Sequence, residues 1–103
     1  MSLKIDIGRN HSIQFVSWAP DRQLNPQFAG IPDDARAGAK VYHPNLKNPA
    51  EECVSYIGLN PALNTDHATW TVEGWEPLTI SPSLLCTVCG DHGFIRQGKW
   101  VPA

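Results

Sequence analysis

The chain has 103 residues, which suits one domain with a modest core and excludes a two-domain enzyme or a full dinucleotide-binding fold. Nine prolines and eight glycines disfavour long helices, because each costs a helix interior about 1–3 kcal/mol, while 42% hydrophobic residues argue against a disordered tail. The formal net charge of −2 leaves no dense basic face for duplex nucleic acid, and no apolar run approaches the roughly 18 residues of a membrane span.

The first 19 residues predict two short strands. Lys4–Ile7 and Ser12–Trp18 are apolar or alternating segments, and the turn Gly8–Asn10 separates them. The opening segment MSLKIDIGRNHS contains no apolar signal core, so we expect a cytoplasmic protein, in the host cytoplasm if a phage encodes it.

Residues 20–39 predict an irregular loop, because three prolines and two glycines interrupt them. Within this loop, Asp33–Ala37 follows Pro32 and predicts a single helical turn, with acidic residues at its start. A loop of this length is long for a small domain, and such loops are often functional.

Residues 40–103 predict a second run of short strands divided by proline, glycine and asparagine turns. None of these segments has an apolar period of 3.6 over ten residues. The fold class predicted for the single domain 1–103 is therefore mostly β, as a compact sheet or partly open barrel with long irregular loops. The expected strands are Lys40–His43, Cys53–Leu59, Thr69–Val72, Leu78–Ile80, Leu84–Cys86, Gly93–Arg96 and Trp100–Val101.

The segment Cys86-Thr-Val-Cys89-Gly90-Asp-His92-Gly predicts a metal-binding knuckle. Two thiols with two residues between them can bind one ion from a tight turn, and Gly90 allows the left-handed backbone that such a turn needs. His92 follows Cys89 by three residues and is close enough to supply an imidazole. We expect Zn²⁺ here, with Cys89 and His92 as the first pair of ligands and Cys86 next.

A structural zinc site needs four ligands, so further candidates are required. Cys53 is the remaining cysteine, and His43 precedes it by ten residues with two prolines between, so both side chains could fold back to one point. Cys53 alone could equally be a small buried apolar residue. His67 lies in a predicted loop and is a weaker candidate, and we expect both His67 and His11 to be ordinary surface histidines.

Two alternatives accompany the metal site. A Cys-x-x-Cys pair can be a redox dithiol, but the residues after Cys89 do not start the helix that this motif usually precedes. The four tryptophans are best explained by core packing. Ser83 lies three residues before Cys86, and its simplest explanation is a proline turn. It could instead be a nucleophile with His92 as its base, but His92 could act as a base only if it did not bind a metal.

An ordered series of short motifs resembles a known family. The motifs are Trp70-Thr-Val-Glu-Gly-Trp75, Thr79-Ile-Ser-Pro-Ser83 and Cys89-Gly-Asp-His-Gly-Phe-Ile95, followed by Gly98. They are similar to a domain of unknown function in small phage and bacterial proteins. Some members carry an ammonia monooxygenase label, and others are similar to proposed peptidases encoded beside bacterial ubiquitin-like conjugation genes.

This resemblance implies a ligand set and an activity. Relatives have a cysteine-rich knuckle before the tryptophan strand, so His43 or Cys53 would take that role beside Cys89 and His92, with Cys86 as an extra or substitute ligand. The implied activity is that of a zinc-dependent peptidase acting on a protein tail, with Asp91 as proton acceptor and Ser83 holding the oxyanion or the water.

Two other functions compete with the peptidase. A closed zinc site in a small domain can simply hold the fold together, which would make the protein a non-catalytic interaction module of phage origin with a protein partner. A nucleic-acid-binding zinc ribbon is the weakest alternative, because Arg96 and Lys99 alone offer little positive charge. The spacing of the motif favours structural and catalytic zinc about equally.

Overall fold

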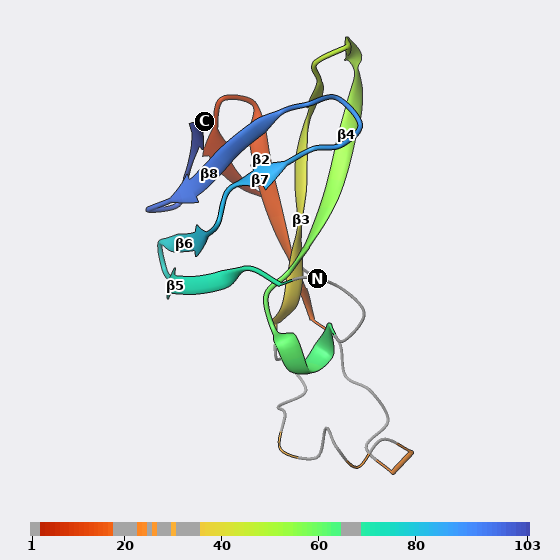
Figure 1. Ribbon diagram of the computed structural model, residues 1–103, viewed down its shortest axis with the longest axis vertical. Helices are drawn as coiled ribbons and strands as arrows, with labels where there is room; N and C mark the ends of the chain where they lie inside the picture. The colour runs from red at the N-terminus through yellow and green to blue at the C-terminus, as the bar shows by residue number, and fades with distance from the viewer. Residues whose placement is uncertain (1–2, 18–22, 25, 27–29, 31–35, 65–68) are drawn as a thin grey trace.

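The computed structural model describes residues 3–17, 23–24, 26, 30, 36–64 and 69–103. Nine strands and one short 3-10 helix form these parts of the chain, and they contain no α-helix (Figure 1). The elements are β1 (Ile5–Gly8), β2 (His11–Ser17), β3 (Arg36–Asn45), β4 (Asn48–Gly58), η2 (Pro61–Leu63), β5 (Thr71–Trp75), β6 (Leu78–Ser81), β7 (Leu84–Leu85), β8 (His92–Arg96) and β9 (Lys99–Pro102).

The strands form three antiparallel sheets. The largest has the order β1-β2-β3-β4, while β5 pairs with β6, and β7, β8 and β9 form a three-stranded sheet. The β1–β2 connection is tight because Arg9 and Asn10 both have positive φ angles, of 54° and 62°, which matches the right-handed twist of a hairpin. At the end of the long β3–β4 hairpin, the Asn45 side chain accepts hydrogen bonds from the backbone N–H groups of Lys47 and Asn48.

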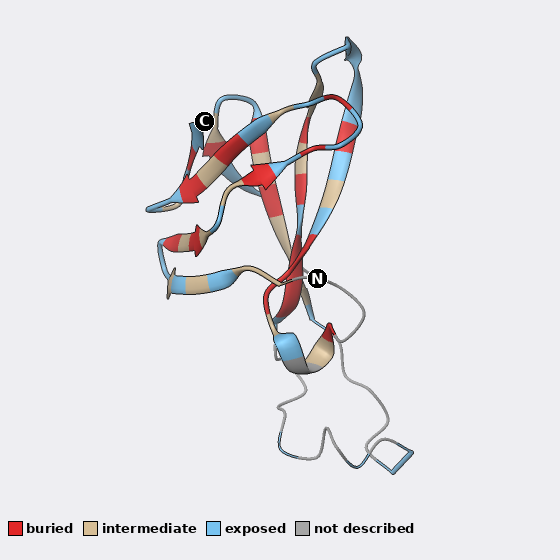
Figure 2. Ribbon diagram, in the orientation of Figure 1, coloured by how far each residue is buried: buried red, intermediate tan, exposed pale blue. Residues whose placement is uncertain are grey.

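The core lies where the faces of these sheets meet, and buried positions recur along each strand (Figure 2). In β3, for example, Ala39, Val41 and His43 are buried, while Lys40 between them is exposed. This alternation follows from the period of two in a strand. One apolar cluster joins all three sheets: Ile7, Ile13, Ala39, Val41, Ile57, Leu59, Leu78, Ile80, Leu84, Ile95 and Trp100.

The structure confirms a mostly β fold, with sheets that do not close into a barrel. The main difference from the predicted strands is length. β3 extends beyond both ends of the predicted strand Lys40–His43, and β4 begins five residues before the predicted start at Cys53. Pro44 and Pro49 had suggested breaks at these points. They are accommodated near the tip of the hairpin, and β4 is an edge strand, where a missing N–H costs little.

Some predictions fall in parts of the chain outside the described residues. Residues 33–35 of the predicted helical turn are among these, whereas Arg36 and Ala37 belong to β3. Trp18, His67 and most of the predicted loop 20–39 also lie outside the described ranges. No helix within the described ranges is long and apolar enough to cross a membrane.

Gly93 of β8 allows the close packing of Trp100 against the sheet. A Cβ atom at this position would lie 2.5 Å from Cζ2 of Trp100 and 2.7 Å from the carbonyl oxygen of Val101. The tryptophan ring also stacks on His11, with 4.2 Å between ring centroids. A side chain at residue 93 would therefore displace a ring that the core and His11 both contact.

The Gly93→Ala variant is expected to lower the free energy of unfolding by about 1–3 kcal/mol, the usual cost of overpacking. Gly74→Ala is the matched control, because its added Cβ would meet its nearest neighbour, the Pro77 carbonyl oxygen, at an ordinary 3.6 Å. Urea denaturation of the two variants, with the same metal content as the parent protein, measures the difference. Equal stability of the two variants would contradict the packing role assigned to Gly93.

Candidate metal centre

Two candidate ligands face each other across the β3–β4 hairpin. His43 of β3 and Cys53 of β4 are direct partners in the antiparallel register, so their side chains point to the same face of the sheet. Both are buried, with 4% and 8% of their surface exposed. The chain between His43 and Cys53 forms the tip of the hairpin, which brings Cys53 back to a position opposite His43.

The other two candidate ligands come from the turn between β7 and β8. The backbone N–H of Cys86 donates to the Asp91 carbonyl oxygen at 2.8 Å, and the N–H of Gly90 donates to the Cys86 carbonyl oxygen at 2.7 Å. Gly90 has a φ angle of +84°, which a side chain would strain. These bonds close a tight turn that brings Cys86 and Cys89 together in the interior.

The ligand atoms of His43, Cys53, Cys86 and Cys89 all lie within 4.8 Å of one another, and all four residues are buried. The three cysteines are free thiols rather than disulfides. A tetrahedral zinc ion with Zn–S bonds of about 2.3 Å holds neighbouring sulfur atoms about 3.8 Å apart, so this spacing fits one ion. The group therefore has the ligand number, ligand types and dimensions of a mononuclear Cys₃His site.

The thiols of this cluster differ in their proton affinity. Burial, together with hydrogen bonds to the thiols of Cys89 and Cys86, raises the pKa of Cys53 to about 11. Burial also acts to raise the pKa of Cys86, but hydrogen bonds from the backbone at Cys89 and Val88 and from the side chains of Cys89 and Ser55 together outweigh it and lower that pKa to about 7. The turn thus stabilises a thiolate at Cys86, which is the form that binds a metal.

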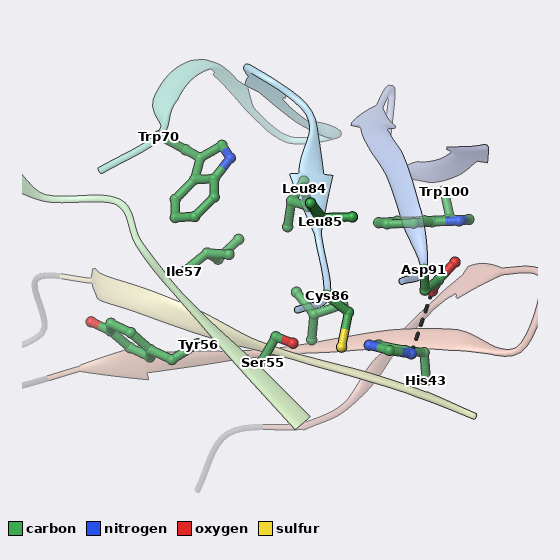
Figure 3. A pocket seen from close by; sticks show the side chains of 11 residues that line it. His43, Ser55, Tyr56, Ile57, Trp70, Leu84, Leu85, Cys86, Asp91 and Trp100 are labelled. Atoms are coloured by element: carbon green, nitrogen blue, oxygen red, sulfur yellow. Dashed lines mark ion pairs between the residues drawn. The ribbon is translucent and has the colours of Figure 1, made fainter. Parts of the chain in front are cut away.

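The imidazole of His43 is oriented by groups on the side away from the cysteines. Its Nδ1 lies 3.3 Å from Oδ2 of Asp91 and 3.1 Å from the carbonyl oxygen of Pro44, and both are acceptors. The proton therefore belongs on Nδ1, and Nε2, which lies toward Cys86 in Figure 3, keeps its lone pair. A carboxylate behind a histidine is the usual support of a metal ligand.

His11 is a second partner of Asp91, and the sequence did not reveal it. Its Nε2 lies 2.5 Å from Oδ2 of Asp91, and its Nδ1 lies 2.7 Å from the carbonyl oxygen of Arg9. Both ring nitrogens therefore lie next to hydrogen-bond acceptors, one on the backbone and one on a carboxylate. His11 is only 7% exposed, which corrects its prediction as a surface histidine. The strand alternation that buries Ile13 could have shown that His11 faces the same way.

The structure does not bring His92 into the cluster, although the sequence had placed it with Cys89 as the first ligand pair. His92 begins β8 as an exposed residue, and its Nε2 lies 2.8 Å from Oγ of Ser83. The reason is strand alternation: the buried neighbour Gly93 faces the core, so His92 faces outward. Ser83 therefore contacts His92. The carboxylate of Asp91 contacts the four-residue group at His43, and its carbonyl oxygen accepts from the backbone N–H of Cys86.

A small cavity of about 70 Å³ borders the cluster on the side of Cys86 and His43 (Figure 3). Its walls are largely apolar, with Ile57, Leu84 and Trp70 among them, and Ser55 supplies a hydroxyl group. This is enough space for a few water-sized molecules beside the ligand atoms.

The chain matches no protein-family model, no curated protein and no solved structure.

Proposed function

We propose that this protein is a small binding module whose fold is held together by one zinc ion, and that it is not itself an enzyme. One observation carries the proposal: four buried side chains of metal-binding type converge on one point, from segments far apart in the sequence. Four protein ligands complete a tetrahedral zinc site and leave no position for a reactive water, as in structural zinc sites.

The location of the cluster explains why a metal would matter for stability. It joins the β3–β4 hairpin, which supplies His43 and Cys53, to the turn between β7 and β8, which supplies the other two cysteines. β7 has only two residues and forms only a short ladder with β8. A domain of this size has a modest core, and an ion bound to both segments would fix one against the other.

The chemistry of the ligands favours zinc, and a reducing compartment. Three thiolates and an imidazole suit zinc, and a buried, closed site excludes the waters that a harder ion such as Mg²⁺ would keep. The three cysteines are free, which suits the cytoplasm, where thiols stay reduced. Zinc in this environment would be permanently bound rather than exchanged during a reaction.

The proposal is tested by metal analysis and cobalt substitution of the purified protein. We expect about one equivalent of zinc per chain and, after exchange with Co²⁺, the visible d–d bands of a tetrahedral ion with thiolate-to-cobalt charge transfer. A folded protein without bound metal would contradict the proposal. So would a cobalt spectrum typical of six oxygen and nitrogen ligands.

A metal-dependent hydrolase acting on a protein tail is the second candidate, and the cavity beside Cys86 is the observation that favours it. Such an enzyme needs a water on the metal, and the cavity offers space for one. Thiocyanate added to the cobalt protein distinguishes the two functions. An unchanged spectrum supports the closed structural site, whereas conversion to a five-coordinate spectrum, with chelator-sensitive cleavage of a ubiquitin-like tail, supports the hydrolase.

A further inference from the structure

A second cavity lies outside the metal centre and shares no residue with it. This cleft of about 370 Å³ lies between the β1–β2 hairpin and two turns of the smaller sheets, and we call it the aromatic cleft. Its lining residues are Ile5, Ile7, Ile13, Phe15, Arg36, Trp75, Glu76, Pro77, Leu78, Gln97, Gly98 and Lys99. The volume is within the roughly 300–1,000 Å³ typical of small-molecule sites.

Backbone pairing fixes one wall of the aromatic cleft. The β5–β6 and β8–β9 turns lie at the same side of the molecule (Figure 1), and the N–H of Gly98 donates to the carbonyl oxygen of Leu78 at 2.8 Å. The N–H of Gln97 donates to Oγ1 of Thr79 at 2.9 Å. The two turns are thus tied together, and the wall is formed before any ligand binds.

The floor of the aromatic cleft combines aliphatic and aromatic side chains with a cation. The rings of Phe15 and Trp75 lie 6.1 Å apart at 52°, and the guanidinium carbon of Arg36 lies 4.1 Å and 5.4 Å from their centroids. Stacking on two rings holds the guanidinium in place while its N–H groups stay available at the edges. Trp75 is 43% exposed, which is unusual for a tryptophan that serves the core alone.

The charged side chains around the aromatic cleft favour an anionic ligand. Among the described residues that line the cleft, Arg36 and Lys99 are the cations and Glu76 is the one carboxylate, although the chain as a whole is acidic. Within the described part of the chain, no carboxylate forms an ion pair with either cation. With respect to the described residues, the donors of Arg36 and Lys99 are therefore available to a ligand carboxylate.

We propose that the aromatic cleft binds a small aromatic carboxylate, with the apolar body against Trp75 and the isoleucines and the carboxylate on Arg36 and Lys99. This inference rests on the proposed function, because it names the ligand class of the binding module. Small-molecule sites usually combine an apolar lining with a few placed polar groups, and the aromatic cleft has this composition. The guanidinium provides the fork of donors that suits a carboxylate.

Titration with a matched pair of probes tests the proposal. The probes are 1-naphthylacetate and its neutral amide, 1-naphthylacetamide, added to the zinc-loaded protein while backbone amide NMR signals are followed. We expect the acid to shift the signals of Gln97, Gly98 and Lys99 with a dissociation constant at or below about 1 mM. The amide is expected to bind about tenfold more weakly or worse, because it lacks the charge-assisted bonds. Equal binding of acid and amide, or no binding of the acid, would overturn the proposal.

Variants assign the binding to the aromatic cleft. Arg36→Gln is expected to weaken binding of the acid by about tenfold and to leave the weak binding of the amide unchanged. Arg96→Gln is the matched control, because Arg96 also stacks on an aromatic ring, with its guanidinium carbon 4.2 Å from the Phe94 centroid, but lies outside the cleft. Equal losses in the two variants would show nonspecific charge attraction and overturn the assignment.

The metal content of each sample separates this inference from the proposed function. If the zinc-loaded protein does not bind 1-naphthylacetate, the ligand assignment is overturned and the metal-site proposal is unaffected. A folded, metal-free protein that binds the acid through Arg36 overturns the zinc proposal and supports the ligand assignment. The two sites share no residue, so the two results can be read independently.

Discussion

The His43→Gln variant is expected to lose its zinc and most of its stability, whereas His92→Gln is expected to keep both. Structural zinc contributes about 10–16 kcal/mol of apparent binding free energy, and a small domain is stable by only about 5–15 kcal/mol. His43 is buried within the four-residue group, while His92 is exposed and contacts Ser83. We expect His43→Gln to be largely unfolded at 25 °C, and His92→Gln to change the Tm by less than about 4 °C.

Zinc content and thermal unfolding of the two variants, measured side by side, check this result. The pair is well matched, because each substitution removes one imidazole and adds one amide. If His43→Gln does not fold, circular dichroism of the parent protein before and after chelation provides the same comparison without a mutation. Loss of zinc in His92→Gln, or an unchanged parent protein after complete zinc removal, would contradict the assigned ligands and the structural role.

The Asp91→Asn variant is expected to fold but to bind zinc about 10–100-fold more weakly, which is the usual effect of removing the carboxylate behind a histidine ligand. Asp91 lies between His43 and His11, and its Oδ2 is close to a ring nitrogen of each. The amide has no charge with which to strengthen its hydrogen bond to His11 or to polarise His43. Competition with a chromophoric zinc chelator measures the affinity directly.

Glu52→Gln is the control for this variant. Glu52 precedes the candidate ligand Cys53 in sequence but is exposed, and it forms no hydrogen bond or ion pair with His43 or His11 within the described residues. We expect its zinc affinity to stay within about twofold of the parent value. Similar losses in both variants would mean that Asp91 acts only through the net charge of the domain.

Much of the strand layout could be read from the sequence, because it depends on local patterns. Proline and glycine turns mark where each strand ends, and apolar segments between them have the length of strands. There are two exceptions. The predicted strand Thr69–Val72 is found at Thr71–Trp75 (β5), with Gly74 paired to Thr79 in the sheet rather than in a turn. The other exception is the β3–β4 hairpin. Its predicted strands were too short, because Pro44 pairs with Glu52 and the ladder resumes with Asn45 and Asn48 after an irregularity that contains Pro49.

The site residues divide in the same way. The Cys86–Cys89 knuckle depends on four residues and a glycine, so the sequence indicated it directly. Cys53 and His43 remained candidates, because their convergence depends on a register that only the folded hairpin sets. His92 was ranked too high, since proximity in sequence says nothing about the face of the strand on which a side chain lies.

The sequence by itself therefore determined a small, turn-rich β domain with a cysteine knuckle, since turns, strand periods and Cys-x-x-Cys spacing are local properties. Tertiary structure decided which histidine lies beside the knuckle, because that histidine must be on the buried face of a strand that packs against Cys86 and Cys89. It also decided the role of Asp91, which contacts His11 across 80 positions of the chain. The arrangement of Arg36 over Phe15 and Trp75 likewise depends on three strands meeting, and no local pattern encodes that meeting.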